Sequence, residues 1–387
     1  MRDRRAALVV FFIIIILLTQ SALAVPAFAR RYKFSCTTCH SPFPRLKAYG
    51  DEFAGNGFMI PEEEKARDYI SAGDDMLWLN KTFPVAVRFD AFAMLKTRGN
   101  VKGDLQSPFG IKLLSGGALY KNIGYYFYFY MYEKGEIAGL EDAYIHFNNI
   151  FGSNLDILAG QFQTCDPLMK RELRLSYEDY QIFKTRIGNS IINLSYDRGV
   201  VLVYNVDQTG TDIVLTATNG NGIGEADATF DQDKYKNVML RVAQGIGQNV
   251  RIGGFYYLGR EQPEDSLYSN KATFLGPDLY LTLGKFAFTG QYVLRKDTNP
   301  FFRAADSNVA TSGIVAELVF SPQLDQSKAY YTLLYNRIDS DLDAHDYQSV
   351  ALNGSYLLAR NLRLVGELIY DLENEESIFV VGFVTAF

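Results

Sequence analysis

The sequence predicts a mainly β protein, in which a membrane-spanning barrel of about sixteen antiparallel strands follows a small helical segment. Three observations lead to this prediction. Aromatic residues make up 14% of the chain, and membrane barrels carry girdles of such residues at both interfaces. From residue 82 onward, apolar and polar residues alternate in segments of about 10 residues, the length of a membrane strand. Short links between these segments alternate with longer polar ones.

The alternation is clear in residues 362–370. Leu364 and Leu368 fall on one face of the predicted strand, and Arg363 and Glu367 fall on the other. Charges on one face are expected in a polar barrel lumen, whereas in a packed apolar core they would be costly. Two further segments with the same pattern are 250–258 and 285–295.

The links between the strands divide into two classes. Short links lie near 121–124, 148–153, 207–210, 245–248, 284 and 359–361. Longer polar links lie near 97–108, 164–198, 220–235, 260–271 and 296–309. This asymmetry is typical of bacterial outer-membrane barrels, whose short turns face the periplasm. The last segment closes on Phe387 and resembles the assembly signal of outer-membrane proteins, so we expect a barrel over 81–387, surrounded by outer-membrane lipid.

The N-terminus predicts export. Arg2, Arg4 and Arg5 precede an apolar run from Ala6 to Leu18, and Ser21-Ala22-Leu23-Ala24 is a small-residue cleavage site. The apolar run is shorter than the roughly 20 residues of a transmembrane helix. We therefore predict a cleaved signal peptide over 1–24. A retained anchor and cleavage after Ala29 are the alternatives.

One motif points to a cofactor. Residues 36–40 read Cys-Thr-Thr-Cys-His, the C-x-x-C-H pattern of covalent c-type haem attachment. We expect Cys36 and Cys39 to bond one haem c and His40 to be the proximal ligand of its iron. A redox dithiol or half of a zinc site would also use such a cysteine pair. Neither is favoured, because no βαβ context is present and Cys165 is the one other cysteine.

The flanks of the motif resemble a small monohaem cytochrome domain, which we place at 25–80. The stripe Leu46, Tyr49 and Phe53 predicts a helix over 44–53. Gly50 lies within this helix, where a haem edge could approach closely. A second helix is predicted from Pro61 to Gly73.

The second axial ligand of the iron stays open. Met76 and Met59 are the candidates that follow His40, and a thioether ligand would raise the reduction potential relative to a second histidine. The alternatives are ordinary packing of both methionines, with five-coordinate iron or ligation by His146.

Two barrel segments have further expected roles. The aromatic run 125–132 would direct a ladder of tyrosines into the lumen, where packing is favoured over an electron path: Tyr126, Tyr128, Tyr130 and Tyr132. The link 164–198 resembles the loop that folds inward in phosphate-selective-type porins, and a surface loop is the alternative.

A longer match extends the haem motif on both sides. The matching residues are Ala24-Val25-Pro26-Ala27-Phe28-Ala29-Arg30, then Cys36, Cys39 and His40, then Phe43-Pro44, Leu46, Tyr49-Gly50 and Phe53. This arrangement resembles the fused monohaem cytochrome–porins, the outer-membrane iron oxidases of iron-oxidising bacteria. The resemblance implies oxidation of extracellular Fe(II), with the electron passing through one haem to a periplasmic c-type cytochrome. On this hypothesis the cytochrome segment sits in the barrel as a plug.

The sequence also bears on functions other than iron oxidation. The net charge of −6 disfavours a nucleic-acid partner, which would need a basic patch. The chain shows none of the familiar catalytic motifs, so its status as an enzyme of the iron-oxidase type stays open. Outward electron transfer to an extracellular acceptor is one alternative. The other is a diffusion porin whose haem is structural or sensory.

Overall fold

The computed structural model describes residues 27–60, 84–100, 102–165, 169–224, 229–305 and 307–387. The predicted signal peptide, the predicted helix from Pro61 and the candidate ligand Met76 lie outside the described residues.

The described chain is mainly β. Its short α-helices are α2 (Ala27–Tyr32), α3 (Cys36–Cys39), α4 (Ala48–Gly55) and α5 (Gln181–Lys184). Its 3-10 turns are η1 (Ile150–Gly152), η2 (Arg171–Leu173), η3 (Leu324–Gln326) and η4 (Asp343–His345). Its strands are β1 (Val85–Lys96), β2 (Gly103–Tyr120), β3 (Ile123–Glu133), β4 (Gly139–Phe147), β5 (Leu155–Gln163), β6 (Tyr196–Val206), β7 (Thr211–Thr218), β8 (Asn237–Ile246), β9 (Val250–Glu261), β10 (Asn270–Leu283), β11 (Phe286–Asp297), β12 (Val309–Phe320), β13 (Ala329–Ser340), β14 (Tyr347–Ala359), β15 (Leu362–Asp371) and β16 (Glu376–Ala386).

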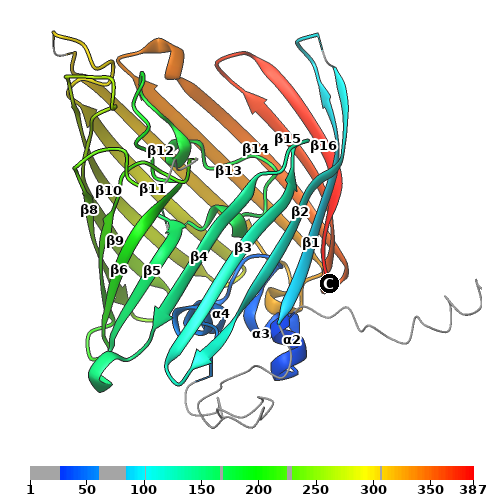
Figure 1. The fold of residues 1–387 in the computed structure, drawn as a ribbon. Helices are drawn as coiled ribbons and strands as arrows, with labels where there is room; N and C mark the ends of the chain where they lie inside the picture. The colour runs from blue at the N-terminus through cyan, green and yellow to red at the C-terminus, as the bar shows by residue number, and fades with distance from the viewer. Residues whose placement is uncertain (1–26, 61–83, 101, 166–168, 225–228, 306) are drawn as a thin grey trace, which may run out of the picture.

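The strands of the described residues close into one barrel of sixteen (Figure 1). Each strand pairs antiparallel with its neighbour in the chain, and β1 pairs with β16 to complete the ring. Arg88 lies opposite Ala386 in this closing pair. The prediction of about sixteen antiparallel strands is confirmed. Among the described residues, none of the helices is long and apolar enough to cross a membrane.

The two faces of the strands differ as predicted. On β15, Leu364 and Leu368 are 40% and 50% exposed, whereas Arg363 and Glu367 are 2% and 1% exposed. Soluble proteins show the reverse, because charged residues are rarely fully buried in them. Apolar side chains on the outer face and polar ones inside are the arrangement of a barrel surrounded by lipid.

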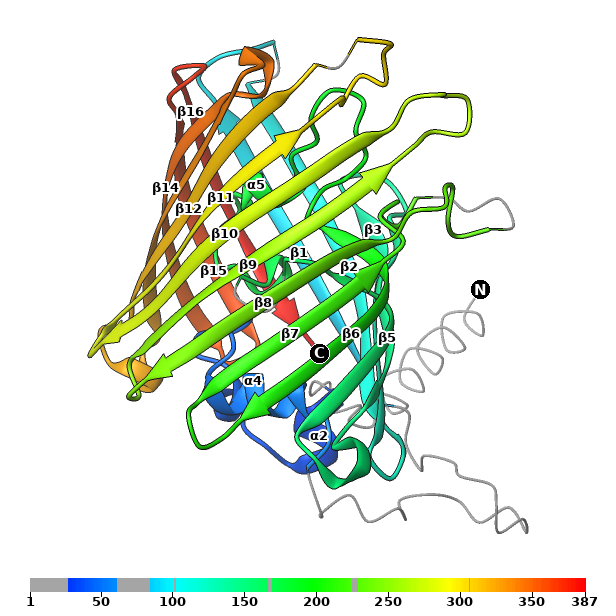
Figure 2. The same ribbon diagram turned by 90° about the vertical axis from the view of Figure 1, so that its left-hand side faces the viewer.

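The two ends of the barrel also differ (Figures 1 and 2). The N-terminal helices and the C-terminus lie at the end with the short turns, and most of the long connections lie at the other end. The short links fall where the sequence predicts them. The first long link is shorter than predicted, because β2 already begins at Gly103.

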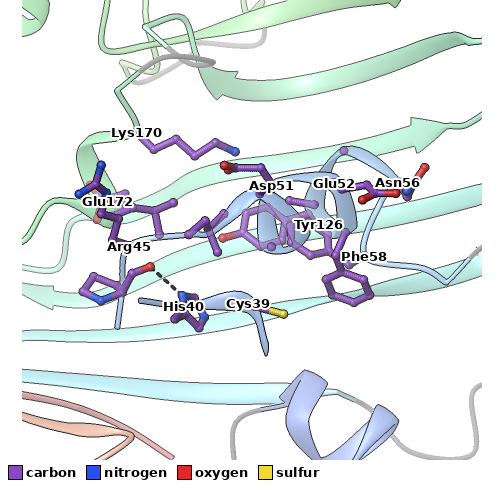
Figure 3. A pocket seen from close by; sticks show the side chains of 18 of the residues that line it. Cys39, His40, Arg45, Asp51, Glu52, Asn56, Phe58, Tyr126, Lys170 and Glu172 are labelled. Carbon is purple, nitrogen blue, oxygen red and sulfur yellow. Dashed lines mark hydrogen bonds between the residues drawn. The ribbon is translucent and has the colours of Figure 1, made fainter. Parts of the chain in front are cut away.

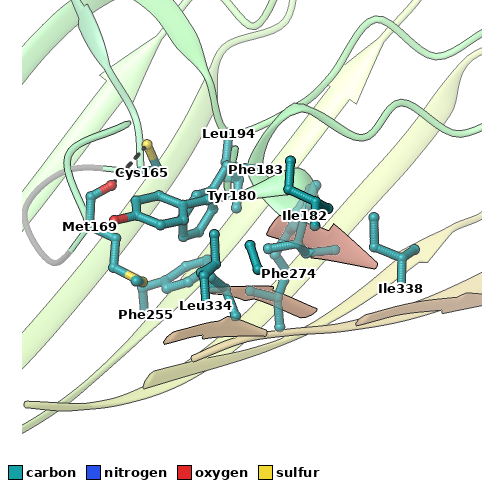
Figure 4. Close-up of a cluster of buried hydrophobic side chains, with 14 of the residues drawn as sticks. Cys165, Met169, Tyr180, Ile182, Phe183, Leu194, Phe255, Phe274, Leu334 and Ile338 are labelled. Atoms are coloured by element: carbon teal, nitrogen blue, oxygen red, sulfur yellow. Dashed lines mark hydrogen bonds between the residues drawn. The ribbon is translucent and has the colours of Figure 1, made fainter. Parts of the chain in front are cut away.

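The long connection between β5 and β6 folds into the barrel, as in the porin loop that it resembles. Its residues Ile182, Phe183 and Leu194 pack against Phe274 of β10 and Leu334 of β13 in one buried apolar cluster (Figure 4). We call residues 169–195 the inward loop.

Charged residues of the wall bind the backbone of the inward loop. Arg363 donates a hydrogen bond to the Leu175 carbonyl at 2.9 Å. Glu367 accepts hydrogen bonds from the backbone N–H groups of Tyr177 and Glu178, at 2.6 and 2.8 Å. These lumenal charges, which the sequence places on one strand face, therefore compensate buried backbone groups of the loop instead of facing only water.

Candidate functional site

The Cys-Thr-Thr-Cys stretch forms the short helix α3 at the mouth of the barrel. Ser35 begins it as N-cap and accepts a hydrogen bond from the Thr37 N–H at 3.4 Å. Both Cys36 and Cys39 carry free thiols, and both are partly buried. Burial raises the pKa of each thiol, so both are largely protonated at neutral pH. Two reduced thiols one helical turn apart are what covalent attachment of a haem requires.

His40 has a defined orientation. Its Nδ1 lies 2.8 Å from the Pro44 carbonyl oxygen, so Nδ1–H donates and Nε2 keeps a free lone pair. Burial lowers the pKa of the imidazole, which favours the neutral form that ligates metals. The Phe43 ring meets the imidazole edge to face at 5.4 Å. His40 therefore has the tautomer and the charge of an iron ligand.

The helix predicted over 44–53 begins later than expected. The backbone of Leu46 instead pairs with that of His40, and α4 begins at Ala48. The chain at 40–46 is thus used to hold the imidazole rather than to start a helix. Of the predicted apolar stripe, Phe53 is buried and Tyr49 is 39% exposed.

Gly50 lines the cavity, so the expected approach of a haem edge stays a prediction, and the residue also has a second role in the fold. A Cβ at this position would lie 2.4 Å from the Cys39 carbonyl oxygen. Glycine is therefore needed for the close approach of α4 to the motif helix, which is a contact between protein backbones.

A cavity of about 1110 Å³ joins the motif to the lumen (Figure 3). Cys36, Cys39 and His40 line it, together with wall residues that include Tyr126 and Tyr128 of β3. This volume exceeds the upper end of the range of about 300–1,000 Å³ for small-molecule sites.

One side of the cavity is an aromatic wall. Phe58 stacks between Phe28 and Tyr126, with ring centroids 5.0 and 4.6 Å away. Glycine in the barrel permits this contact, because a Cβ at Gly124 would lie 2.5 Å from the Gly57 carbonyl oxygen. The predicted inward direction is confirmed for Tyr126 and Tyr128, which line the cavity, and for Tyr130, which is 1% exposed. Tyr132 lies beyond a register shift between β2 and β3 and is only partly buried.

The inward loop borders the cavity on the side away from the N-terminal segment. Met169, Lys170 and Glu172 of the loop line it. The amino group of Lys170 points toward Asp51 of α4 across the space (Figure 3). The cavity therefore lies between the N-terminal segment at the mouth and the packed loop deeper in the barrel.

The structure separates the candidates for a second iron ligand. Met59 is buried but does not line the cavity with His40, and Met76 lies outside the described residues. Met169 and His146 do line it. Met169 escaped the sequence analysis, although the expected inward fold of its loop could have indicated it. His146 lies with its Nε2 3.6 Å from Asp156 Oδ2.

The residues present fit a covalently bound haem c. The two thiols and the free Nε2 of His40 are the groups that attachment of such a haem requires, and the aromatic wall offers apolar contact beside them. Buried and aromatic surroundings also exclude water from a bound group.

Comparison with known proteins supports the fold. No known family's sequence profile matches the chain, and no curated protein sequence does. Among solved structures, the outer membrane channel DcaP of Acinetobacter baumannii matches with a TM-score of 0.58 at 12% identity, over 78% of this chain and 96% of that one. The anion-selective porin from Comamonas acidovorans matches with a TM-score of 0.56 at 11% identity, over 79% and 99%. The chain therefore has the fold of outer-membrane porins.

Proposed function

We propose that this protein lies in the outer membrane, exported with its residues 1–24 as a cleaved signal peptide, and transfers electrons across that membrane through one haem c. The observation that carries this proposal is the C-x-x-C-H motif opening on a lumenal cavity, with an oriented His40 and a packed loop on the other side. In this account residues 25–80 are the cytochrome segment and 81–387 the barrel. Extracellular Fe(II) is the proposed donor, and a periplasmic c-type cytochrome is the proposed acceptor.

Each group near the motif has a role in this proposal. Cys36 and Cys39 attach the haem, and His40 Nε2 ligates its iron, which supplies one-electron chemistry when bound. The Pro44 carbonyl keeps the imidazole in the required tautomer. Phe58 and Tyr126 close one side of the cavity against water.

The second candidate function is solute diffusion, which the porin fold favours. The inward loop argues against it. Porin channels hold water, whereas here Phe183 and Leu334 are 0% exposed within an apolar cluster that extends from the loop to the wall. A lumen closed by the loop would block the diffusion of solutes. It would not block electron transfer, which needs no water-filled channel. The reverse direction, outward to an extracellular acceptor, uses the same residues.

The identity of the distal ligand is a separate part of the proposal. Met59 and Met76 remain candidates, and the cavity adds Met169 and His146. Replacing each by alanine and recording the oxidised haem spectrum identifies the ligand. Loss of a sulfur-to-iron charge-transfer band in a single methionine variant assigns that methionine, and an unchanged spectrum in all four variants supports five-coordinate iron.

Anaerobic mixing of the haem-loaded protein with Fe(II) tests the proposed function. We expect prompt reduction of the haem, seen in its absorbance. His40→Ala should abolish this reduction, and His345→Ala, in η4 on the connection between β13 and β14, should not. A haem that stays oxidised under Fe(II) but is reduced by periplasmic cytochromes would favour the outward direction. A purified exported protein without covalent haem would overturn the proposal.

A further inference from the structure

Among the described residues, charge is distributed unequally between the two ends of the barrel. At the short-turn end, the described turns and residues 27–60 carry nine basic and four acidic side chains. The basic ones are Arg30, Arg31, Lys33, Arg45, Lys47, Lys121, Lys285, Lys328 and Arg360. The acidic ones are Asp51, Glu52, Asp207 and Asp325.

The opposite end has the reverse balance. Leaving out the inward loop, its described connections carry ten acidic and six basic side chains. The acidic ones are Glu136, Asp231, Asp233, Glu264, Asp265, Asp341, Asp343, Asp346, Glu373 and Glu375. A field of this sign concentrates cations such as Fe(II). The described surface around the haem motif, with its excess of basic side chains, would instead attract an anionic group on a partner.

Two of the basic residues, Arg360 and Lys47, lie near the attachment thiols, and Lys33 precedes them closely in the chain. Lys33 is exposed and lies three residues before Cys36. Arg360, in the turn between β14 and β15, is near enough to Cys36 to offset part of the rise that burial causes in the pKa of this thiol. Lys47 lies near Cys39 but is paired with Asp325 at 2.5 Å. Neither Lys33 nor Arg360 has an ion-pair partner among the described side chains.

We propose that the short-turn face around Lys33 and Arg360 docks a soluble electron-transfer protein through an acidic surface on that protein. This inference rests on the proposed function and specifies the chemistry of its periplasmic partner. A haem held by Cys36, Cys39 and His40 would supply one electron, becoming oxidised, and the redox centre of the partner would accept that electron and be reduced. No bond forms or breaks in either protein. Complementary charge would speed the encounter and bring the partner to the haem edge.

Membrane lipid is a competing explanation for basic residues at this end, since anionic headgroups also attract lysine. The two explanations involve different residues. Lys121 and Lys285 lie in turns of the barrel wall, between β2 and β3 and between β10 and β11. Arg360 lies near Cys36, and Lys33 lies three residues before Cys36 in the chain. A charge reversal at each pair therefore distinguishes docking at the motif from a general effect of charge at the rim.

The test uses the full chain, loaded with haem and held in lipid nanodiscs that leave both faces accessible. Its haem is reduced with ascorbate, the excess is removed, and an oxidised blue-copper protein of acidic surface is added. Haem oxidation should be faster than with a basic blue-copper protein, and it should slow as salt rises. The double variant Lys33→Glu with Arg360→Glu should slow it by about tenfold or more at low salt.

The matched control is Lys121→Glu with Lys285→Glu, which changes the same charge at the rim and should leave the rate nearly unchanged. Equal slowing by both double variants, or a rate that does not respond to salt, would overturn the docking proposal. The haem spectrum recorded before mixing distinguishes failure of the docking proposal from failure of the proposed function. A purified protein without haem would contradict the proposed function before any partner is added.

Discussion

Two segments occupy the inside and the mouth of the barrel, and they are held in different ways. The inward loop is continuous with the wall's apolar cluster, and its Phe183 and Ile187 are 0% exposed. Wall charges such as Arg363 bind its backbone. The N-terminal segment over 27–60 instead contacts the wall through the Phe58 stack and an exposed ion pair, and it borders a cavity.

This difference assigns the inward loop mainly to the stability of the barrel and the N-terminal segment mainly to function. A loop that buries apolar side chains in the cluster of the wall contributes to the stability of the barrel, because buried apolar area is the main stabilising term in folding. A segment beside a large cavity leaves room for a bound group. We therefore expect changes in the loop to affect the barrel, and changes in the segment to affect haem binding while the barrel stays folded.

Replacing the loop should have the largest effect. A variant with a short Gly-Ser linker in place of 170–194 should show channel steps in planar bilayers, because removal of the loop opens the lumen. The native protein should show none. Deleting residues 262–269, in the connection between β9 and β10, is the control and should not open a channel. Porin-like conductance of the native protein would show that the loop leaves a continuous water path.

Phe183→Ala should lower the free energy of unfolding by about 3–5 kcal/mol, because it leaves a cavity in the packed cluster. Denaturation in urea, followed by circular dichroism and by the heat-modifiable gel mobility of the barrel, measures this change. Phe151→Ala is the matched variant, since Phe151 is 101% exposed in the short turn before β5. Equal destabilisation by the two substitutions would refute the role of the loop as part of the core.

Gly124→Ala should detach the segment and spare the barrel. The added Cβ would lie 2.5 Å from the Gly57 carbonyl oxygen, and such overpacking costs about 1–3 kcal/mol. This cost corresponds to a shift of about 5- to 150-fold toward the undocked segment. Faster limited proteolysis of the segment and a lower haem content would both report this undocking. Gly366→Ala is the control, because a Cβ there meets nothing within 4 Å.

Asp325→Asn should have the smallest effect, about 1 kcal/mol or less, since its ion pair with Lys47 is exposed. Burial raises the pKa of Asp325, but the hydrogen bonds from Lys47 and Ser41 and the charge of Lys47 together outweigh burial, so the net pKa is lowered. The contribution is therefore present above the unfolded pKa of about 3.9 and is lost as pH falls through the lower folded value. The resistance of the N-terminal segment to limited proteolysis, measured as a function of pH, checks this prediction. If the resistance fell at acid pH in the Asp325→Asn protein as much as in the native protein, the prediction would be contradicted.

Much of the barrel could be predicted from the sequence. Period-two alternation specifies which side chains face lipid, so the placement of Leu364 outside and Arg363 inside followed directly. The hydrogen-bond partner of Arg363 could not be predicted from this alternation. Its partner is the Leu175 carbonyl, 188 positions away, and such a contact depends on how the loop packs.

The motif was predicted in identity but not in geometry. Cys36, Cys39 and His40 follow from spacing, whereas the bond from His40 to Pro44 depends on the fold of the residues between them. Gly50 shows the same limit, since close contact with Cys39 is a tertiary feature. Met169 is an intermediate case, because the expected inward fold of its loop pointed to the lumen but not to this particular cavity.

The central claim is that electrons cross the barrel through one haem while solutes do not. Liposomes that contain the haem-loaded protein, with ferricyanide and a fluorescent dye enclosed, test it when Fe(II) is added outside without oxygen. We predict that the ferricyanide is reduced, that the dye is retained, and that the His40→Ala protein reduces none. Ferricyanide that stays oxidised beside haem-loaded protein, or reduction that accompanies loss of the dye, would contradict the account.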